Sequence, residues 1–146
     1  MRFIITAQAG PGVPGADQPF SEQQLVAYMQ YNEALHRAGV LVASEGLNPT
    51  AGGARIAVRD GRRYLVDGPF AESKELVGGF YLIEVPSLDE AIEWALRCPV
   101  GMASAEVLEV RPLTAAGDIP PELLRIITAA APGWSAEMFQ QQRGPA

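Results

Sequence analysis

Four stretches of the chain have the apolar, β-branched composition that is typical of β-strands. In residues 78–85 the side chains of a strand would alternate between two faces, with Phe80, Leu82 and Glu84 on one face and Tyr81, Ile83 and Val85 on the other. The four stretches are residues 2–8, 40–47, 78–85 and 105–113.

Two amphipathic helices are predicted between these strands. The first begins at Ser21, since Gln24 three residues later completes a capping box, and it ends at Gly39. Ser87 and Glu90 mark the start of the second in the same way. On helical wheels, each helix has one stripe that is expected to face the sheet. In the first helix the stripe is Leu25, Tyr28, Met29, Asn32, Leu35, His36 and Gly39. In the second helix it is Leu88, Ala91, Ile92, Ala95 and Leu96.

Residues 55–66 are predicted to form a β-hairpin, because Asp60-Gly61 suits a two-residue turn with positive φ angles. The order of elements then matches the α+β, ferredoxin-like split β-α-β pattern with an added hairpin. Both helices would cover one sheet face. The other face would expose more apolar surface than a soluble monomer normally does, so we expect a homodimer to form through it.

The C-terminal part of the chain is expected to lie outside the ferredoxin-like pattern. Residues 1–113 are predicted to form the ferredoxin-like domain, and residues 114–146 a C-terminal helical extension with a loose end. The proline in "IPPELLRIITAAAPGW" suits a helix start, and "QQQRGPA" is the expected loose tail.

Composition narrows the possible functions. The chain has 146 residues, 48% of them hydrophobic, and a formal net charge of −6, which disfavours nucleic acid as a partner. It has no apolar run long enough to span a membrane and no signal-peptide core, so we expect a cytoplasmic protein. One cysteine, Cys98, and one histidine, His36, cannot supply a Cys/His metal site, and no cofactor is expected.

Four segments, in their order along the chain, resemble the YCII-related family in its DGPF-motif branch: "NEALHRAGVLVASEGL", "DGPFAESKE", "GGFYLIEV" and "SLDEAIEWA". The likeness extends over residues 1–113 and implies a ferredoxin-like fold that forms a dimeric α+β barrel. Related barrels include metal-free enzymes with lyase, isomerase or dehalogenase activity on small organic molecules. In the shorter branch a histidine and an aspartate are the suspected catalytic dyad, but Tyr28 and Cys98 occupy those places here, so that mechanism does not carry over.

Asn32 and His36 lie one turn apart on the predicted sheet-facing stripe, where polar groups need partners. Either Asn32 bonds to a strand while His36 is solvated at the margin, or both line a pocket with Tyr28 in which His36 acts as an acid or base. Tyr81 is either core or pocket lining, and Cys98 is expected to be a buried thiol.

Residues 67–75 join two predicted strands and allow two interpretations. In the structural one, Asp67 accepts backbone hydrogen bonds and Phe70 fills the core. In the functional one, the segment is a pocket rim where Asp67 or Glu72 is a general base and Lys74 holds an anionic substrate group. Glu45, at a strand end, is either solvated or a further carboxylate of the same cavity.

These residues favour a dimeric small-molecule-binding protein. The activity that they allow is that of a cofactor-free lyase or isomerase in which a carboxylate or His36 acts as the base. The alternative is a non-catalytic ligand sensor or an accessory protein linked to transcription regulation, as the resemblance also suggests. Substrate identity is not encoded in any recognisable motif.

Overall fold

The computed structural model describes residues 1–9, 21–47, 54–67, 77–100 and 106–141. The main domain contains β1 (Arg2–Ala9), α1 (Glu22–Arg37), β2 (Leu41–Gly46), β3 (Ala54–Arg59), β4 (Arg62–Asp67), β5 (Val77–Glu84), α2 (Leu88–Leu96) and β6 (Glu106–Pro112). A short 3-10 turn, η1 (Ala116–Asp118), and two helices, α3 (Pro121–Ala130) and α4 (Pro132–Gln141), follow.

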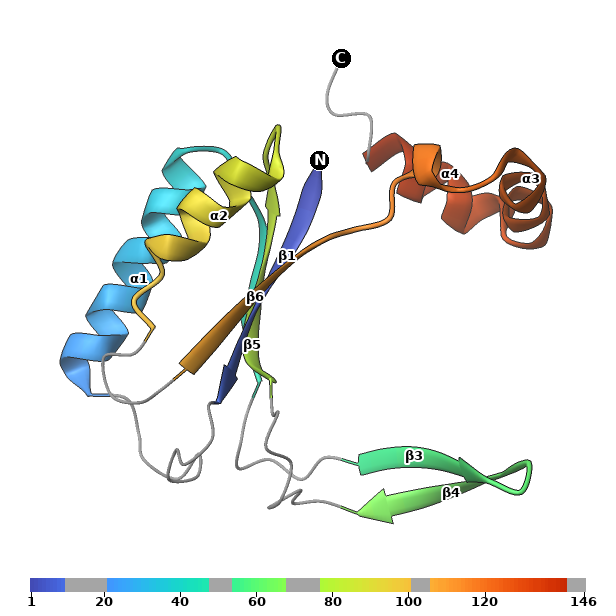
Figure 1. The fold of residues 1–146 in the computed structure, drawn as a ribbon, viewed down its shortest axis with the longest axis horizontal. Helices are drawn as coiled ribbons and strands as arrows, with labels where there is room; N and C mark the ends of the chain where they lie inside the picture. The colour runs from blue at the N-terminus through green and yellow to red at the C-terminus, as the bar shows by residue number, and fades with distance from the viewer. Residues whose placement is uncertain (10–20, 48–53, 68–76, 101–105, 142–146) are drawn as a thin grey trace.

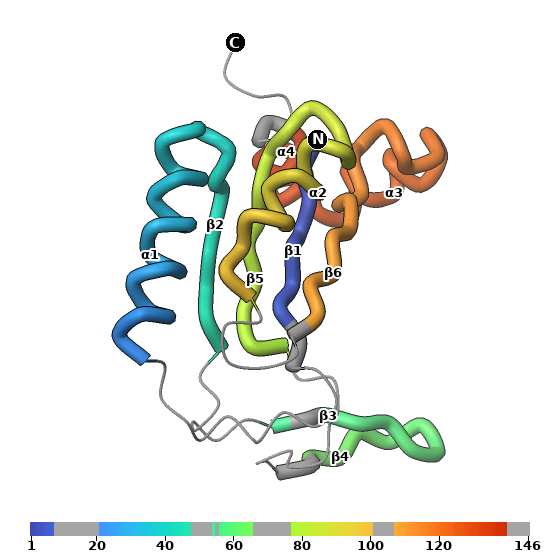
Figure 2. The backbone as a smooth tube through the Cα atoms, turned by 60° about the vertical axis from the view of Figure 1, so that its left-hand side comes forward, coloured from blue at the N-terminus to red at the C-terminus, as the bar shows by residue number. Residues whose placement is uncertain are grey.

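The main sheet has the strand order β2-β5-β1-β6, and each neighbouring pair is antiparallel. Figure 1 shows α1 and α2 together on one side of it. In Figure 2 α1 lies beside β2, while α2 crosses the sheet near β1 and β6. This arrangement confirms the predicted ferredoxin-like α+β fold.

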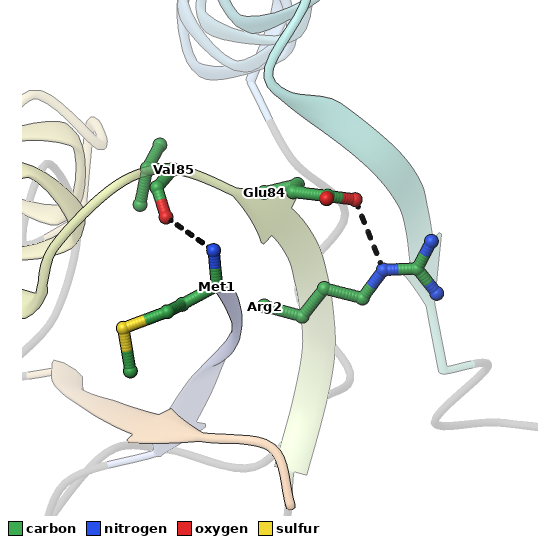
Figure 3. Close-up of polar contacts among 4 residues, drawn as sticks. All are labelled: Met1, Arg2, Glu84 and Val85. Carbon is green, nitrogen blue, oxygen red and sulfur yellow. Dashed lines mark hydrogen bonds and ion pairs between the residues drawn. The ribbon is translucent and has the colours of Figure 1, made fainter. Parts of the chain in front are cut away.

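The first residues of the chain hold β1 against β5 (Figure 3). The Met1 amino group donates to the Val85 carbonyl oxygen at 2.8 Å, and Arg2 Nε lies 3.1 Å from Glu84 Oε2. Arg2 and Glu84 are also paired in the strand register. Both contacts therefore support the register that places Tyr81 opposite Ile5.

Both helices begin where the sequence predicts. The Ser21 hydroxyl accepts from the Gln24 backbone N–H at 3.2 Å, and the Gln24 side chain accepts from the Ser21 N–H at 2.8 Å. The Ser87 hydroxyl accepts from the Glu90 N–H in the same way. Gly39 follows α1 with a φ of 70°, a conformation that glycine adopts without steric cost.

The predicted sheet-facing stripes are only partly correct. On α1, Leu25, Met29 and His36 are exposed, whereas Tyr31 and Leu35 are buried. The buried arc of α1 is narrow and is centred on Tyr28 and Leu35, because this helix covers one edge of the sheet.

The stripe predicted to face the sheet on α2 is also only partly correct. Leu88, Ile92 and Leu96 are exposed, while Ala91, Trp94 and Ala95 are buried. The buried side of this helix is thus made of Ala91, Trp94 and Ala95, and the larger aliphatic residues fall on its flank.

The hairpin prediction is confirmed. Asp60 has φ 51° and Gly61 has φ 73°, and Arg59 pairs with Arg62 across the turn. Its strands, β3 and β4, form a two-stranded sheet separate from the main one. The hairpin projects from one end of the domain (Figure 1).

The C-terminal extension contains a helix that was not predicted. Pro121 begins α3, as expected, but a second helix, α4, starts at Pro132 and includes Gln140 and Gln141 of the predicted loose tail. Proline is compatible with the first turn of a helix, so Pro132 ends one helix and allows the next to begin. Ser135 is buried at this junction and donates to the Pro132 carbonyl oxygen at 3.2 Å.

Candidate functional site

The core between the helices and the sheet contains a group of polar side chains, Tyr31, Tyr81 and Cys98, which we call the buried polar cluster. Tyr31 comes from α1, Tyr81 from β5, and Cys98 follows α2. The two tyrosine rings meet edge to face with centroids 5.1 Å apart. The Tyr31 hydroxyl donates to the Trp94 carbonyl oxygen at 2.9 Å, and the Tyr81 hydroxyl is hydrogen-bonded to the Cys98 thiol.

Both tyrosines of the cluster are held in their neutral form. Burial raises the pKa of Tyr31 and of Tyr81 well above the ordinary value, and interaction with Cys98 raises both further. At neutral pH these hydroxyls therefore serve as hydrogen-bonding groups and not as bases. Cys98 is a buried free thiol, which confirms its prediction.

Asn32 adds an unusual feature beside the cluster. Its Oδ1 atom is buried and has no hydrogen-bond partner among the residues that the structure describes. Asn32 follows Tyr31 on α1 and lies one turn after Tyr28, which packs against the core. An unsatisfied buried acceptor is destabilising by about 1–3 kcal/mol, so this oxygen is a natural point for a donor to bind.

The sheet surface near Tyr81 lacks large side chains at one end. The register places Ala7, Gly79 and Gly46 in one row across β1, β5 and β2, which is the next row after that of Tyr81 on the same sheet face. A Cβ atom on Gly79 would come within 3.0 Å of the Glu45 carbonyl oxygen. The close approach of β2 to β5 therefore favours glycine here.

Three of the predicted ligand-binding residues belong to the same layer. Tyr28 is partly buried against the core, Asn32 presents its buried oxygen, and Tyr81 is buried on the helix-facing side of β5. The sequence missed Tyr31, although its spacing of four residues from Leu35 gave a signal for a second buried position on α1.

The remaining predicted residues are placed elsewhere or lie outside the description. His36 is exposed on α1. Glu45 is exposed and pairs with Phe80, on the sheet face away from the helices, so it does not share a face with Tyr81.

Asp67 is the last residue of β4, where it pairs with Ala54, but its side chain lies outside the described part. Phe70, Glu72 and Lys74 are outside the described residues altogether.

Among the residues that the structure describes, no three His, Cys, Asp or Glu side chains gather in an arrangement that would hold a metal ion. Within the same residues, no helix combines the length and the apolar character needed to cross a bilayer.

The strand order and the helix layer define a ferredoxin-like α+β protein with a buried polar cluster in its core. The chain belongs to the YCII-related domain family, whose sequence profile matches residues 1–114.

An uncharacterised protein of Rhizobium meliloti (strain 1021) is 43% identical over 76 residues, which are 52% of this chain and 61% of that protein. A solved structure, 5-chloro-2-hydroxyhydroquinone dehydrochlorinase from Burkholderia phenoliruptrix AC1100 in complex with 2,5-dihydroxybenzoquinone, aligns with 82% of this chain and 100% of its own. It has 20% sequence identity and a TM-score of 0.40, values too low to bear on activity.

Proposed function

We propose that this protein binds a small organic molecule between α1 and the sheet, beside Asn32 and Tyr81. The supporting observation is the buried Asn32 oxygen, which lacks a donor among the described residues. A ligand hydroxyl or N–H that donates to this oxygen would remove the cost of leaving it unsatisfied. Sites of this kind combine apolar walls with a few oriented polar groups, as Asn32, Tyr81 and Tyr28 provide.

The surroundings favour a flat, hydroxylated ligand such as a small phenol or enol. The rings of Tyr31 and Tyr81, with their neutral hydroxyls, give this layer an aromatic and uncharged character. The small side chains of Ala7 and Gly79 occupy the neighbouring row of the sheet. A thin ring therefore fits this layer better than a bulky aliphatic group.

The proposed reaction is a cofactor-free elimination or isomerisation. Asp67 or Glu72 takes a proton from an acidic carbon, and the electron pair either expels a leaving group or shifts a double bond before the proton returns. Lys74 holds an anionic group of the substrate. Residues 68–76 connect Asp67, at the end of β4, to Val77, at the start of β5 and near the Gly79 row, which supports the assignment. The exposed position of His36 favours a carboxylate over His36 as the base.

The protein is proposed to act as a homodimer. Ile4, Phe80 and Leu82 lie on the sheet face away from α1 and α2 and are only partly buried. Covering them with the same face of a second copy would remove this apolar area from water, which favours association.

A binding protein without turnover is the second candidate. The observation that favours it is that the two tyrosines of the buried polar cluster are neutral and supply hydrogen bonds without a base. Such a protein would serve as a ligand sensor or as an accessory subunit linked to transcription regulation. The two candidates differ in whether the bound compound is recovered unchanged.

The test is a thermal-shift screen of small phenols, enols and carboxylic acids on the wild type, Asn32→Leu and Gln30→Leu. A ligand present at about 100 times its Kd raises the stability of the wild type by about 2.7 kcal/mol. The increase should disappear in Asn32→Leu and persist in Gln30→Leu, whose residue lies on the exposed side of the same helix. Equal stabilisation of all three proteins, or no stabilisation by any compound class, would contradict the proposal.

Compounds that bind are then incubated with the wild type, Asp67→Asn and Glu72→Gln, and the products are identified by mass spectrometry. Conversion that is lost in one of the carboxylate variants, with binding retained, supports the enzyme. Unchanged recovery with the wild type assigns the protein to the second candidate.

A further inference from the structure

The β3–β4 hairpin presents an apolar surface that nothing in the described part of the chain covers. Ile56 and Leu65 are paired across the strands, and Val58 lies two residues along on the same face. These three side chains are 73%, 62% and 68% exposed, respectively. We call them the arm surface.

A hairpin of this kind needs support from outside itself. Among the described residues its strands pair only with each other, and Figures 1 and 2 show it projecting away from the main sheet. An isolated two-stranded hairpin is marginally stable in water, and three large aliphatic residues on one exposed face add to its cost. A surface elsewhere is therefore expected to cover the arm surface.

The charge of the hairpin indicates what that surface carries. Residues 54–67 contain four arginines and two aspartates, a net charge of +2. Since the whole chain carries −6, the other residues together carry −8. A second copy of the chain thus brings an excess of acidic groups to a basic hairpin, which favours their association.

The C-terminal helices carry exposed apolar residues of their own. Leu123 and Ile126 on α3 and Trp134 on α4 are 49%, 62% and 55% exposed, respectively. We call these three residues the tail surface. Residues 114–141 contain three acidic residues and one arginine, a net charge of −2, which complements the hairpin.

The arm surface and the tail surface cannot meet within one chain in the arrangement observed. Figure 1 shows the hairpin and α3–α4 on the same side of the sheet, opposite α1 and α2, but at different ends of the domain. Figure 2 separates them in the same way. A two-fold rotation that stacks two sheets face to face, with the strands reversed, exchanges these ends and brings the hairpin of one copy to the helices of the other.

We propose that the β3–β4 hairpin is an arm that packs on the tail surface of a second copy of this chain. Each dimer then contains two equivalent contacts, because a two-fold interface is reciprocal. Ile56, Val58 and Leu65 meet apolar side chains of α3 and α4, and the arginines around them face acidic residues. This inference rests on the pairing of two copies proposed above, and adds which elements form the contact.

Cysteine cross-linking tests the contact directly. The one native cysteine, Cys98, is buried, so introduced cysteines are the ones that react readily. Differently tagged chains carrying Val58→Cys and Ile126→Cys are co-expressed in full length and treated with a short bismaleimide. We expect a cross-linked product that contains both tags. The matched control replaces Ile126→Cys with Gln30→Cys, an exposed position on α1, and should give none.

Charge exchange provides an independent readout in solution. Arg62→Glu with Arg63→Glu should weaken dimerisation by roughly tenfold or more in sedimentation equilibrium, and Glu122→Lys with Glu137→Lys should restore most of the loss. Rescue distinguishes a lost contact from an unfolded hairpin, because an unfolded hairpin is not repaired by changes in α3 and α4.

The outcomes separate this inference from the proposed function. A dimer without the mixed cross-link, or without rescue, overturns the arm contact and leaves the pairing of sheets intact. A monomer at all concentrations overturns both the arm contact and the homodimer. Ligand binding that depends on Asn32 is measured separately, so its loss or survival decides only the proposed function.

Discussion

Replacing Asn32 with leucine should stabilise the ligand-free protein, although it alters a helix that packs on the core. Leucine has nearly the shape of asparagine and carries no polar atom. The buried Oδ1 lacks a donor among the described residues, and such an atom costs about 1–3 kcal/mol relative to an apolar replacement. We therefore expect the free energy of unfolding to rise by about 1–3 kcal/mol. In a chain of this size, each kcal/mol raises Tm by about 2–4 °C.

Urea denaturation followed by circular dichroism at a fixed protein concentration measures this change. Gln30→Leu, the same substitution on the exposed side of α1, should stay within about 0.5 kcal/mol of the wild type. Leu35→Ala, at a fully buried position of the same helix, should lose about 2–5 kcal/mol and shows that the assay reports on this region. If Asn32→Leu is instead less stable than the wild type while Gln30→Leu is neutral, the Asn32 oxygen is satisfied in the free protein and the reasoning fails.

Three further predictions concern the two buried tyrosines and Gly39. Tyr31→Phe removes the hydrogen bond to the Trp94 carbonyl oxygen, which still accepts from the Arg97 backbone N–H at 3.1 Å. The substitution should therefore cost about 0.5–1.5 kcal/mol in urea denaturation, and an unchanged midpoint would contradict a formed bond. Because burial raises the pKa of Tyr31 and Tyr81 in the native state, the unfolded chain loses these protons first as the pH rises. Stability is thus retained below about pH 10 and falls above it by up to about 1.4 kcal/mol per pH unit for each tyrosine, and Tyr31→Phe should show a shallower fall. Gly39→Ala, at φ 70°, should cost about 1–2 kcal/mol, whereas Gly117→Ala, which meets no neighbouring atom and has no positive φ, should cost less.

The sequence predicted those parts of the fold that local rules determine. Ser21 with Gln24 and Asp60 with Gly61 each act through atoms a few residues away, so their motifs can be recognised without knowledge of the tertiary structure. The alternation in β5 likewise separated Tyr81 from Phe80, and the structure shows that the face with Tyr81 is the buried one. These features, with the order of strands and helices, were enough for the ferredoxin-like topology.

The buried faces of the helices depend on packing that the sequence does not show. Leu25 and Leu96 fit the apolar periodicity of their helices, yet both are exposed, while Trp94 is buried. A helix with apolar residues on more than one flank can turn either flank to the sheet, and the choice depends on side-chain volumes in all neighbouring elements. The candidate site was affected in the same way, since the sequence proposed His36 and missed Tyr31 on one helix.

The proposed arm and the proposed ligand site are connected through one segment of chain. Strand β4 ends at Asp67, and β5, which carries Tyr81, begins at Val77. If the hairpin docks on a second copy, the dimer contact fixes the end of β4 at which Asp67 lies. The position of a carboxylate base then depends on dimerisation, whereas the Asn32 oxygen depends only on α1. Val58→Asp, which places a charge on the arm surface, should therefore reduce turnover of a verified substrate more than it reduces binding. Equal losses in turnover and binding would instead mean that the hairpin supports the whole domain.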